Sequence, residues 1–559
     1  MRFSRTSKAI GVAAIAALAL TACGGGGGGT SSSGSNASGN AEAIVSAFGG
    51  EPQKSLIPAN TGEVFGGRVV ELLFQGLLSY DASGKPVNEL AESIDSSDQQ
   101  TYTIKIKTGT KFTNGEDVTA KTFVDSWNFS ALSTNALTNS SFFAPIEGYD
   151  DVSATTGEGD AAKPAPKAQT MSGLKVVDDS TFTVKLTAPN SDFKLGLGYS
   201  AFDPIPSAAI KDPKTYGEKP VGNGPYKMGP DGWQHDKSIS LVKNPDYKGP
   251  REAKNGGITF KIYTDTAGAY ADAQSDNGNL DVMDGVPGNN LTTYQNDFPD
   301  RNLNKSSASN ASLNVPSYVP GFSGEEGTLR RQAISLAIDR AEICKVIFSG
   351  TRSPAQGFTV STLPGFDANI AGSDVLKFDA AKAADLWAQA DKIKPWDASK
   401  PLTIAYNTDG AGNKEWVDAV ANQLKNNLKI NAEGKPYPKF AAMLDDRQKQ
   451  KLTGLVRAGW QSDYPSIYNT LSPLFSTGAS SNYEKYSNPQ VDQLLQDGLK
   501  AGSADESAKK WNEAEAILYK DLPNLPLWDT QQQAIWGTKV SGVDLDWRGA
   551  IIYNQIVKS

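Results

Sequence analysis

The amino-acid sequence predicts a mixed α/β protein, because segments with the period of a strand alternate with segments that have the period of a helix. Apolar residues recur at every second position in four segments, which favours half-buried strands: residues 102–107, 182–186, 258–262 and 402–406. Apolar residues recur at intervals of three and four positions in three other segments, which favours amphipathic helices: residues 120–127, 329–337 and 511–518. After the amino-terminal segment, no apolar run reaches the ~20 residues that a membrane-spanning helix needs.

The first 22 residues have the order of charges and apolar residues that is typical of a secretory signal peptide. Three cationic residues precede an apolar stretch at 9–19, and this stretch is too short to span a membrane. Cys23 closes the run Leu20-Thr21-Ala22-Cys23, which resembles a bacterial lipobox. We therefore expect a signal peptide at 1–22 and lipidation of the Cys23 thiol. The alternative is an ordinary secreted protein with a chance cysteine.

Residues 23–40 are expected to form the lipidated cysteine and a flexible tether. Six glycines are followed by TSSSGSNASGN, and no apolar residue larger than alanine is present to build a core. A chain of this kind spans roughly 23 Å. The folded part would then lie at the outer face of the cytoplasmic membrane, anchored by lipid, and two acyl chains would hold it more firmly than one. The glycine run is no dinucleotide fingerprint, since no strand precedes it and no helix follows.

Composition excludes several classes of protein. Removal of the signal peptide leaves 537 of the 559 residues and changes the formal charge from −8 to −11, which argues against a nucleic-acid binder. Cys344 is the only other cysteine, so acylation of Cys23 would leave no intramolecular disulfide. We expect Cys344 to be buried as a small apolar residue.

The sequence contains no pattern of catalytic or metal-binding residues. His235 is the single histidine, which excludes a two-histidine zinc helix, and a surface turn is the expected place for it. We find no phosphate-binding loop, no serine nucleophile elbow and no series of cysteines that would hold a metal. We therefore predict a binding protein without catalytic residues, metal or cofactor.

Four stretches, in this order and spacing, resemble the extracellular solute-binding proteins of family 5, which serve peptide, dipeptide and nickel ABC importers. The pattern is closest to that of the oligopeptide-binding proteins, and the resemblance extends from about residue 43 to the carboxyl terminus. The stretches are YTIKIKTGTKFTNGEDVTAKTFVDSWNF (102–129), PVGNGPYKM (220–228), LRRQAISLAIDRAEI (329–343), and RAGWQSDYPSIYNTLSPLF (457–475) with the residues that follow it to 495. A structural role in turns and packing is an alternative for most of these residues.

The resemblance implies a two-lobed periplasmic-binding-protein type II fold with an extra domain on lobe I. Lobe I is expected to comprise residues 41–85, 220–312 and 531–559, the extra domain residues 86–219, and lobe II residues 313–530. The hinge crossings would lie near 310–316 and 529–536. The ligand would lie between the lobes, which close around it.

The resemblance also assigns a role to Asp463. In the oligopeptide binders the aspartate after a similar AGW-containing run pairs with the free α-ammonium of the ligand. A desolvated ammonium needs an anion and hydrogen-bond acceptors, and a carboxylate supplies both. The alternative is that Asp463 caps a turn before Pro465. The other residues of the run are expected to contact the ligand: Trp460, Gln461, Ser462 and Tyr464.

Two further segments are candidate ligand contacts by resemblance. Arg457 matches an arginine that meets the carboxylate of the ligand in oligopeptide binders, and a structural ion pair is its alternative. The loop at 60–64, with Asn60, Thr61 and Glu63, falls where the family offers backbone groups to an extended ligand. A peptide held in this way would be bound as an added strand.

The resemblance therefore implies a monomeric lipoprotein that binds short peptides, delivers them to an ABC permease and ATPase complex in the membrane, and is no enzyme. Two other classes remain open at this point. One is the same fold with an oligosaccharide or another small solute as ligand. The other is a sensor or adhesion lipoprotein that serves no transporter. With His235 alone, direct binding of nickel through imidazole is not expected.

Overall fold

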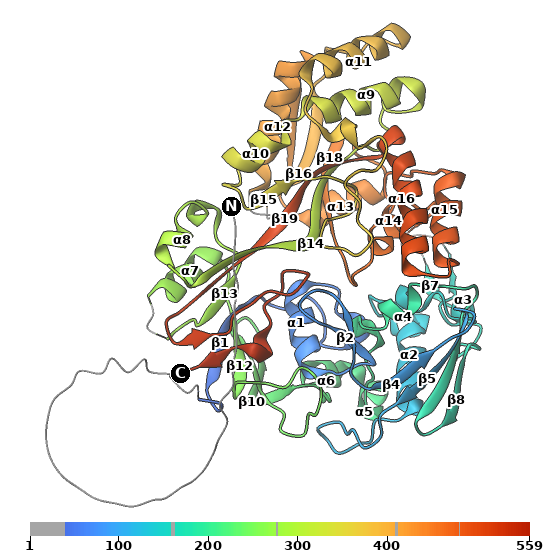
Figure 1. Ribbon diagram of the computed structural model, residues 1–559, viewed down its shortest axis with the longest axis vertical. Helices are drawn as coiled ribbons and strands as arrows, with labels where there is room; N and C mark the ends of the chain where they lie inside the picture. Colours follow the sequence, from blue (N-terminus) through green and yellow to red (C-terminus); the bar gives the residue numbers. More distant parts are fainter. Residues whose placement is uncertain (1–39, 158–161, 276–277, 409–411, 480) are drawn as a thin grey trace, which may run out of the picture. The chain divides into compact units, whose positions relative to one another are not determined.

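The computed structural model describes residues 40–157, 162–275, 278–408, 412–479 and 481–559 (Figure 1). The predicted signal peptide, Cys23 and the tether up to residue 39 lie outside the described residues. No helix within the described ranges combines the length and apolar character that are needed to cross a membrane.

The largest sheet has eleven strands. In chain order they are β1 (Ile44–Gly49), β10 (Tyr226–Gln234), β11 (Ser238–Lys243), β12 (Gly257–Ile262), β13 (Val282–Asp284), β14 (Asn302–Asn314), β15 (Arg352–Pro354), β16 (Leu402–Asn407), β17 (Ala432–Tyr437), β18 (Leu455–Gln461) and β19 (Asn524–Trp536). In space, neighbouring strands follow the order β10-β11-β12-β1-β13-β19-β14-β18-β16-β17, and β15 pairs with β19. Parallel pairs, such as β1 with β12 and β16 with β17, lie on both sides of the antiparallel β14–β19 pair.

The remaining strands form small sheets. They are β2 (Leu78–Tyr80), β3 (Pro86–Asn88), β4 (Ala91–Asp95), β5 (Thr101–Ile106), β6 (Thr155–Thr156), β7 (Lys163–Pro164), β8 (Leu174–Asp178), β9 (Thr181–Lys185), β20 (Val540–Ser541) and β21 (Val557–Lys558). The four-stranded sheet has the order β4-β5-β9-β8. Its inward positions alternate as the sequence predicted, since Tyr102, Ile104 and Ile106 are buried and the residues between them are exposed.

The helices of the first half of the chain are α1 (Val64–Leu73), α2 (Ala120–Ala131), α3 (Tyr149–Val152), α4 (Phe193–Gly196), α5 (Ser207–Lys211), α6 (Pro213–Glu218), α7 (Thr266–Gln274) and α8 (Tyr294–Asp297). Those of the second half are α9 (Gly324–Ala337), α10 (Arg340–Val346), α11 (Ala380–Ile393), α12 (Asn413–Leu428), α13 (Phe440–Gln448), α14 (Tyr468–Phe475), α15 (Pro489–Leu499) and α16 (Ala504–Asp521). The four predicted strands and the three predicted helices are therefore confirmed as β5, β9, β12, β16, α2, α9 and α16.

Two large hydrophobic cores account for most of the buried apolar residues. The first joins β1, β12, α1 and the four-stranded sheet with α2, so the predicted extra domain shares its core with the predicted lobe I. The second lies between β16, β18 and helices α9, α12 and α16, and it includes Cys344, which is a buried free thiol as expected. The predicted domain boundaries stay a prediction.

The strands β14 and β19 run from one core to the other. Each has thirteen residues, and they pair from Asn302↔Ile535 to Asn314↔Asn524. Leu303 packs on the first core, whereas Leu313 belongs to the second. The backbone pairing is irregular between Ser306 and Asn310, which is where the strands pass between the cores.

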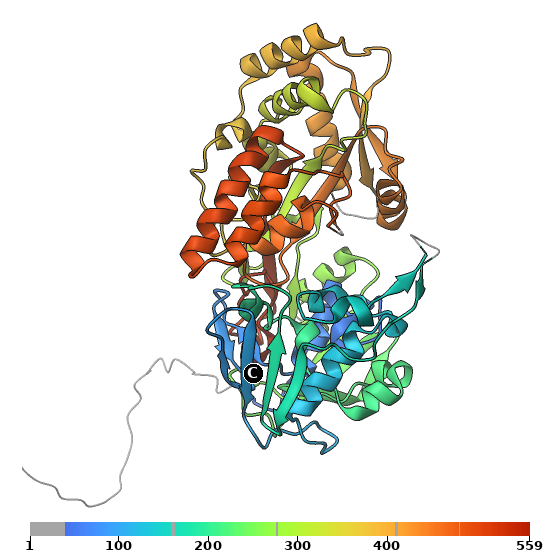
Figure 2. The same ribbon diagram turned by 90° about the vertical axis from the view of Figure 1, so that its right-hand side faces the viewer.

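A second contact between the two parts involves helices α15 and α16, which Figure 2 shows side by side in red. The backbone N–H of Ser191, just before α4, donates to the carbonyl of Leu499 at 2.7 Å. The Ser191 hydroxyl lies 3.2 Å from the Gly498 carbonyl oxygen and 3.1 Å from the Ser507 hydroxyl. The segment before α4 therefore contacts α15 and α16 at a point distant in sequence from β14 and β19.

Candidate ligand-binding site

Helix α1 and the loop before it form one wall of the candidate site. Glu63 is the amino-terminal cap of α1, since its carboxylate accepts hydrogen bonds from the N–H groups of Phe65 at 2.7 Å and Gly66 at 2.8 Å. An acidic cap also interacts favourably with the positive end of the helix dipole. The Thr61 hydroxyl donates to the Ile57 carbonyl at 3.0 Å. Both side chains are therefore held in place by local structure.

The opposite wall comes from the end of β18. The strand ends at Gln461, and the N–H of Ser462 donates to the carbonyl of Ala308 in β14 at 2.9 Å. The chain then turns, and the N–H of Asp463 donates to the Asn469 side-chain oxygen at 2.8 Å. This turn places Asp463 in a cavity lining that it shares with Glu71 of α1 and with Arg548.

One cavity lies between these walls, and a larger one adjoins it beside α1. The smaller, of about 120 Å³, is lined by Thr61 and Glu63 from one side and Gln461 and Ser462 from the other. The larger has a volume of about 840 Å³. Asp463, Glu71 and Arg548 line both cavities. The structure thus brings together five of the residues singled out from the sequence, and it places Asp463 where the two cavities meet.

Asp463 is a partly buried carboxylate without a cationic partner among the described residues. Among the described residues, its carboxylate accepts one hydrogen bond, from the side-chain amide of Asn469 at 3.3 Å. Burial raises the pKa of Asp463 to about 6, against the lowering effects of Asn469 and of the nearby charge of Arg548. A carboxylate that is desolvated and lacks a counterion is suited to bind a cationic group.

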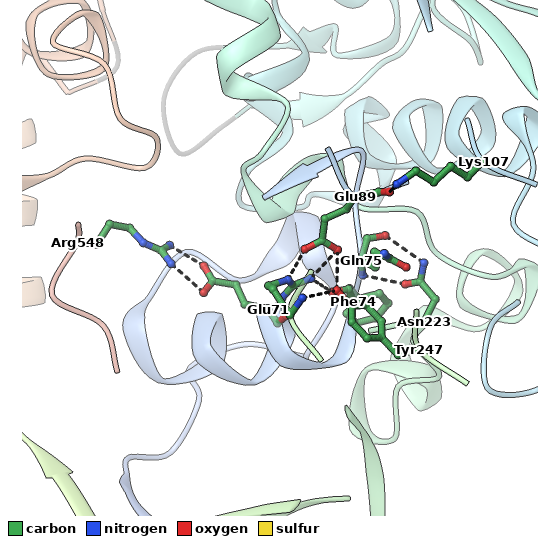
Figure 3. Close-up of polar contacts among 9 residues, drawn as sticks. Glu71, Phe74, Gln75, Glu89, Lys107, Asn223, Tyr247 and Arg548 are labelled. Atoms are coloured by element: carbon green, nitrogen blue, oxygen red, sulfur yellow. Dashed lines mark hydrogen bonds and ion pairs between the residues drawn. The ribbon is translucent and has the colours of Figure 1, made fainter. Parts of the chain in front are cut away.

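Arg548 does not serve as that counterion, because it is bound to Glu71 (Figure 3). Its two terminal nitrogens donate to the two Glu71 oxygens at 2.6 and 2.9 Å, and it also reaches Asp546 at 3.2 Å. Burial works to raise the pKa of Glu71, but Arg548, Arg251 and Arg68 together bring it below its ordinary value. Both members of the pair are therefore charged at neutral pH.

Behind Glu71, a buried polar network fixes the end of α1 (Figure 3). Glu89 is held by Arg251 and accepts from the hydroxyl of Tyr247 at 3.3 Å, and its backbone carbonyl accepts from Lys107 at 2.6 Å. Gln75 and Asn223 exchange hydrogen bonds of 2.9 and 3.0 Å. This network lies against the larger cavity, which Glu71 and Arg251 line.

Four residues singled out from the sequence line neither cavity. The Asn60 side chain bonds Ser55 and Thr138. The Tyr464 side chain interacts with the buried carboxyl of Asp192. Arg457 donates to the Asn407 side-chain oxygen at 2.9 Å and lies over the Phe440 ring. The backbone N–H of Trp460 donates to the Asn310 side-chain oxygen at 3.1 Å. The buried indole N–H of Trp460 has no acceptor among the described residues.

Five residues that line one or both cavities were not predicted from the sequence: Arg68, Glu71, Tyr199, Asp203 and Arg548. Nothing in their local sequence distinguishes them from surface or core residues. Arg68 pairs with Asp284, 216 residues away, and such pairs become visible only in the folded chain. In the described residues, no group of His, Cys, Asp and Glu side chains is arranged to hold a metal ion.

Comparisons with known proteins match this chain over most of its length. Residues 85–482 match the bacterial extracellular solute-binding proteins, family 5. The dipeptide-binding protein of Lactococcus lactis is 28% identical over 85% of this chain and 87% of its own length. The oligopeptide-binding protein OppA of Bacillus subtilis is 27% identical over 90% of both chains.

Solved structures show the same fold. The Haemophilus influenzae OppA complex with the peptide RPPGFSPFR has a TM-score of 0.77 and 23% identity, over 93% of this chain and 99% of that one. The Escherichia coli murein tripeptide binding protein MppA has a TM-score of 0.75 and 21% identity, over 92% of this chain and 98% of that one. The predicted two-lobed type II fold of the periplasmic binding proteins is therefore confirmed.

Proposed function

Because the chain belongs to the bacterial extracellular solute-binding proteins of family 5, we propose that it binds short peptides between its two lobes and delivers them to an ABC importer. The observation that carries this proposal is the position of Asp463, which lines both the cavity between α1 and the end of β18 and the larger cavity that adjoins it. Relatives named as dipeptide- and oligopeptide-binding proteins support the peptide class.

The α-ammonium of a peptide supplies the cation that Asp463 lacks. In a closed cleft the pair would be shielded from water, which strengthens the Coulomb attraction between ammonium and carboxylate. The Asn469 amide keeps one carboxylate oxygen in place. Because Arg548 is bound to Glu71, it does not compete for Asp463.

The peptide backbone would lie between the loop at 60–63 and the end of β18. In this mode, main-chain hydrogen bonds hold an extended ligand whatever its side chains are. Gln461 and Ser462 lie opposite Thr61 and Glu63 across the smaller cavity, which supports a ligand bridging the two walls. Four other predicted contacts lie outside the two linings: Asn60, Arg457, Trp460 and Tyr464. They would hold the lining residues in place, or they would contact the ligand once the lobes have closed.

The protein itself would carry out no reaction. Its task is to bind the peptide, close around it and present the closed form to the permease and ATPase complex. We propose that it is a monomer, anchored by the lipid on Cys23 at the outer face of the cytoplasmic membrane. The tether that follows would let the folded part reach the permease.

Ligand identity is tested first without any assumption about its class. The protein is purified under native conditions and denatured, and the released small molecules are identified by mass spectrometry. Short peptides are the expected result. A released oligosaccharide or metal chelate would place the protein in the alternative class of solute binders.

Calorimetry of the ligand-free protein over a varied peptide library then measures affinity, with the same peptides carrying an N-acetyl group as matched controls. We expect binding of free-amine peptides and weak binding of their acetylated forms. Heat from an oligosaccharide series, with none from any peptide, would overturn the proposal.

A further inference from the structure

The larger cavity contains a second buried carboxyl that the proposed function does not use. Asp203 directly follows the short 3-10 helix Ser200–Phe202, is 8% exposed, and lines the cavity of about 840 Å³. Its backbone N–H donates to the Ser200 carbonyl at 3.0 Å. Its carboxyl oxygens accept no hydrogen bond from any residue that the structure describes.

The arginines around the cavity are already neutralised. Arg68 pairs with Asp284, Arg251 with Glu89, and Arg548 with Glu71. Lys254 also lines the cavity, but it is an exposed residue. Asp203, which is buried, and Asp463, which is partly buried, are therefore the two lining carboxyls of this kind that have no cation bound to them among the described residues.

The absence of a side chain at Gly76 leaves room for the Asp203 carboxyl. A side chain at Gly76 would fill the space beside it, since a Cβ there would lie 2.1 Å from an Asp203 oxygen. Burial raises the pKa of Asp203 well above its ordinary value; Arg251 acts against this shift, whereas Glu89 and Glu71 add to it. A positive charge on a bound ligand would favour the ionised form of this carboxyl and would be attracted to it.

We propose that Asp203 binds a basic side chain near the amino end of the ligand, so that the protein prefers peptides with lysine or arginine beside a free α-ammonium. The proposal rests on the proposed function, because it assumes that Asp463 binds the α-ammonium. The two carboxyls then take the two cationic centres of one ligand within one cavity.

The cavity wall also fits the rest of such a side chain. Leu72, Leu78 and Val87 line it and offer apolar surface to the methylene groups of lysine or arginine. Tyr80 and Trp547, whose ring centroids are 5.7 Å apart, line the same cavity and offer aromatic faces to a cation.

The test compares tripeptides of alanine in which one residue is replaced by lysine, arginine, norleucine or glutamine at position one, two or three. Calorimetry on the wild-type full chain should show that a basic residue at one of these positions improves affinity on the order of thirtyfold over norleucine. Equal affinity of basic and neutral peptides at all three positions would overturn the proposal. Failure of all peptides to bind would instead overturn the proposed function.

Two variants assign the preference to one carboxyl. Asp203→Asn keeps the shape of the side chain, and it should bind basic and neutral peptides with equal affinity. Asp81→Asn is the matched control, because Asp81 lines the same cavity but is exposed and accepts hydrogen bonds from Ser83. This control should retain the full preference. Persistence of the preference in Asp203→Asn would also overturn the proposal.

A separate readout requires no variant. If Asp203 is protonated in the empty site and ionised in the complex, binding of a basic peptide releases a proton to the buffer. The calorimetric enthalpy should then depend on the ionisation enthalpy of the buffer for lysine peptides more than for norleucine peptides. The charged neighbours of Asp203 are Arg251, Glu89 and Glu71. They are the same in the lysine and the norleucine titrations, so the difference between the two peptides reports on Asp203.

Discussion

The guanidinium of Arg548 donates two hydrogen bonds to the carboxylate of Glu71, and this pair joins the carboxyl-terminal segment to the first helix across 477 positions of sequence. Both side chains line both cavities of the candidate site. The pair therefore ties α1 to the carboxyl-terminal segment. Burial raises the pKa of Asp463, and the charge of Arg548 acts against this shift.

Replacing Arg548 by glutamine should leave Glu71 without its counterion. Because the side chains are 19% and 32% exposed, solvent compensates in part, and we expect a loss of about 1–3 kcal/mol in the free energy of unfolding. Urea denaturation measures this loss. The double variant Arg548→Gln/Glu71→Gln should lose less free energy of unfolding than the two single variants together, because each single change already removes the ion pair.

An exposed ion pair provides the control for this variant. Lys377 and Asp374 are each 79% exposed, so Lys377→Gln should leave the unfolding transition unchanged. Wild-type stability of Arg548→Gln would show that its bonds to Glu71 contribute nothing to folding.

Asp463→Ala should weaken the binding of free-amine peptides with neutral side chains by roughly a hundredfold or more. Leaving an ammonium unpaired in a closed cleft costs on the order of 3–5 kcal/mol, and each 1.4 kcal/mol is tenfold in affinity. The effect should be much smaller for N-acetylated peptides, which bring no charge, and calorimetry with both series measures the difference. Equal affinities of wild type and variant would return Asp463 to the role of a turn residue.

The affinity for these neutral free-amine peptides should fall as the pH falls below about 6. Burial raises the pKa of Asp463 to about 6, and a proton on this carboxyl competes with the ammonium of the ligand. The fall should approach tenfold per pH unit. It should be absent in Asp463→Asn, and in Arg548→Gln its midpoint should move to higher pH. A flat profile between pH 4 and 8 would contradict the assignment.

Cys23→Ser should prevent attachment of lipid and leave the protein soluble outside the cell or as an unprocessed precursor. Labelling with radioactive palmitate checks this directly. Cys344→Ser is the matched control, since Cys344 is the buried thiol of the second core, and it should keep its label. Label on the Cys23→Ser protein would exclude this anchor.

Gly222→Ala should destabilise the fold by about 3 kcal/mol or more, because a Cβ at this position would lie 1.9 Å from the Leu73 carbonyl oxygen at the end of α1. Gly67→Ala is the opposite case, since its Cβ would meet no atom within 4 Å and alanine favours the helix by about 0.5–1 kcal/mol. Similar transition midpoints for the two variants would contradict the close approach of Gly222 to α1.

The sequence alone was sufficient to predict four of the strands, three of the helices and the family. The alternation of Tyr102, Ile104 and Ile106 predicted β5, and the spacing of Trp511, Ala514 and Leu518 predicted α16. These patterns are visible in the sequence because the period of buried side chains is a local property of strand and helix geometry. Motif order predicted the family and pointed to Asp463.

Tertiary structure decided which charged groups lie at the cavities and which of them are already paired. Arg457 carried a predicted role but bonds Asn407, whereas Glu71, Asp203 and Arg548 had no local signal and line the larger cavity. The physical reason is that the free energy of a charged side chain depends on its burial and on its partner. Both depend on segments that the sequence separates by hundreds of residues, such as α1 and the carboxyl-terminal strand-and-turn region that contains Arg548.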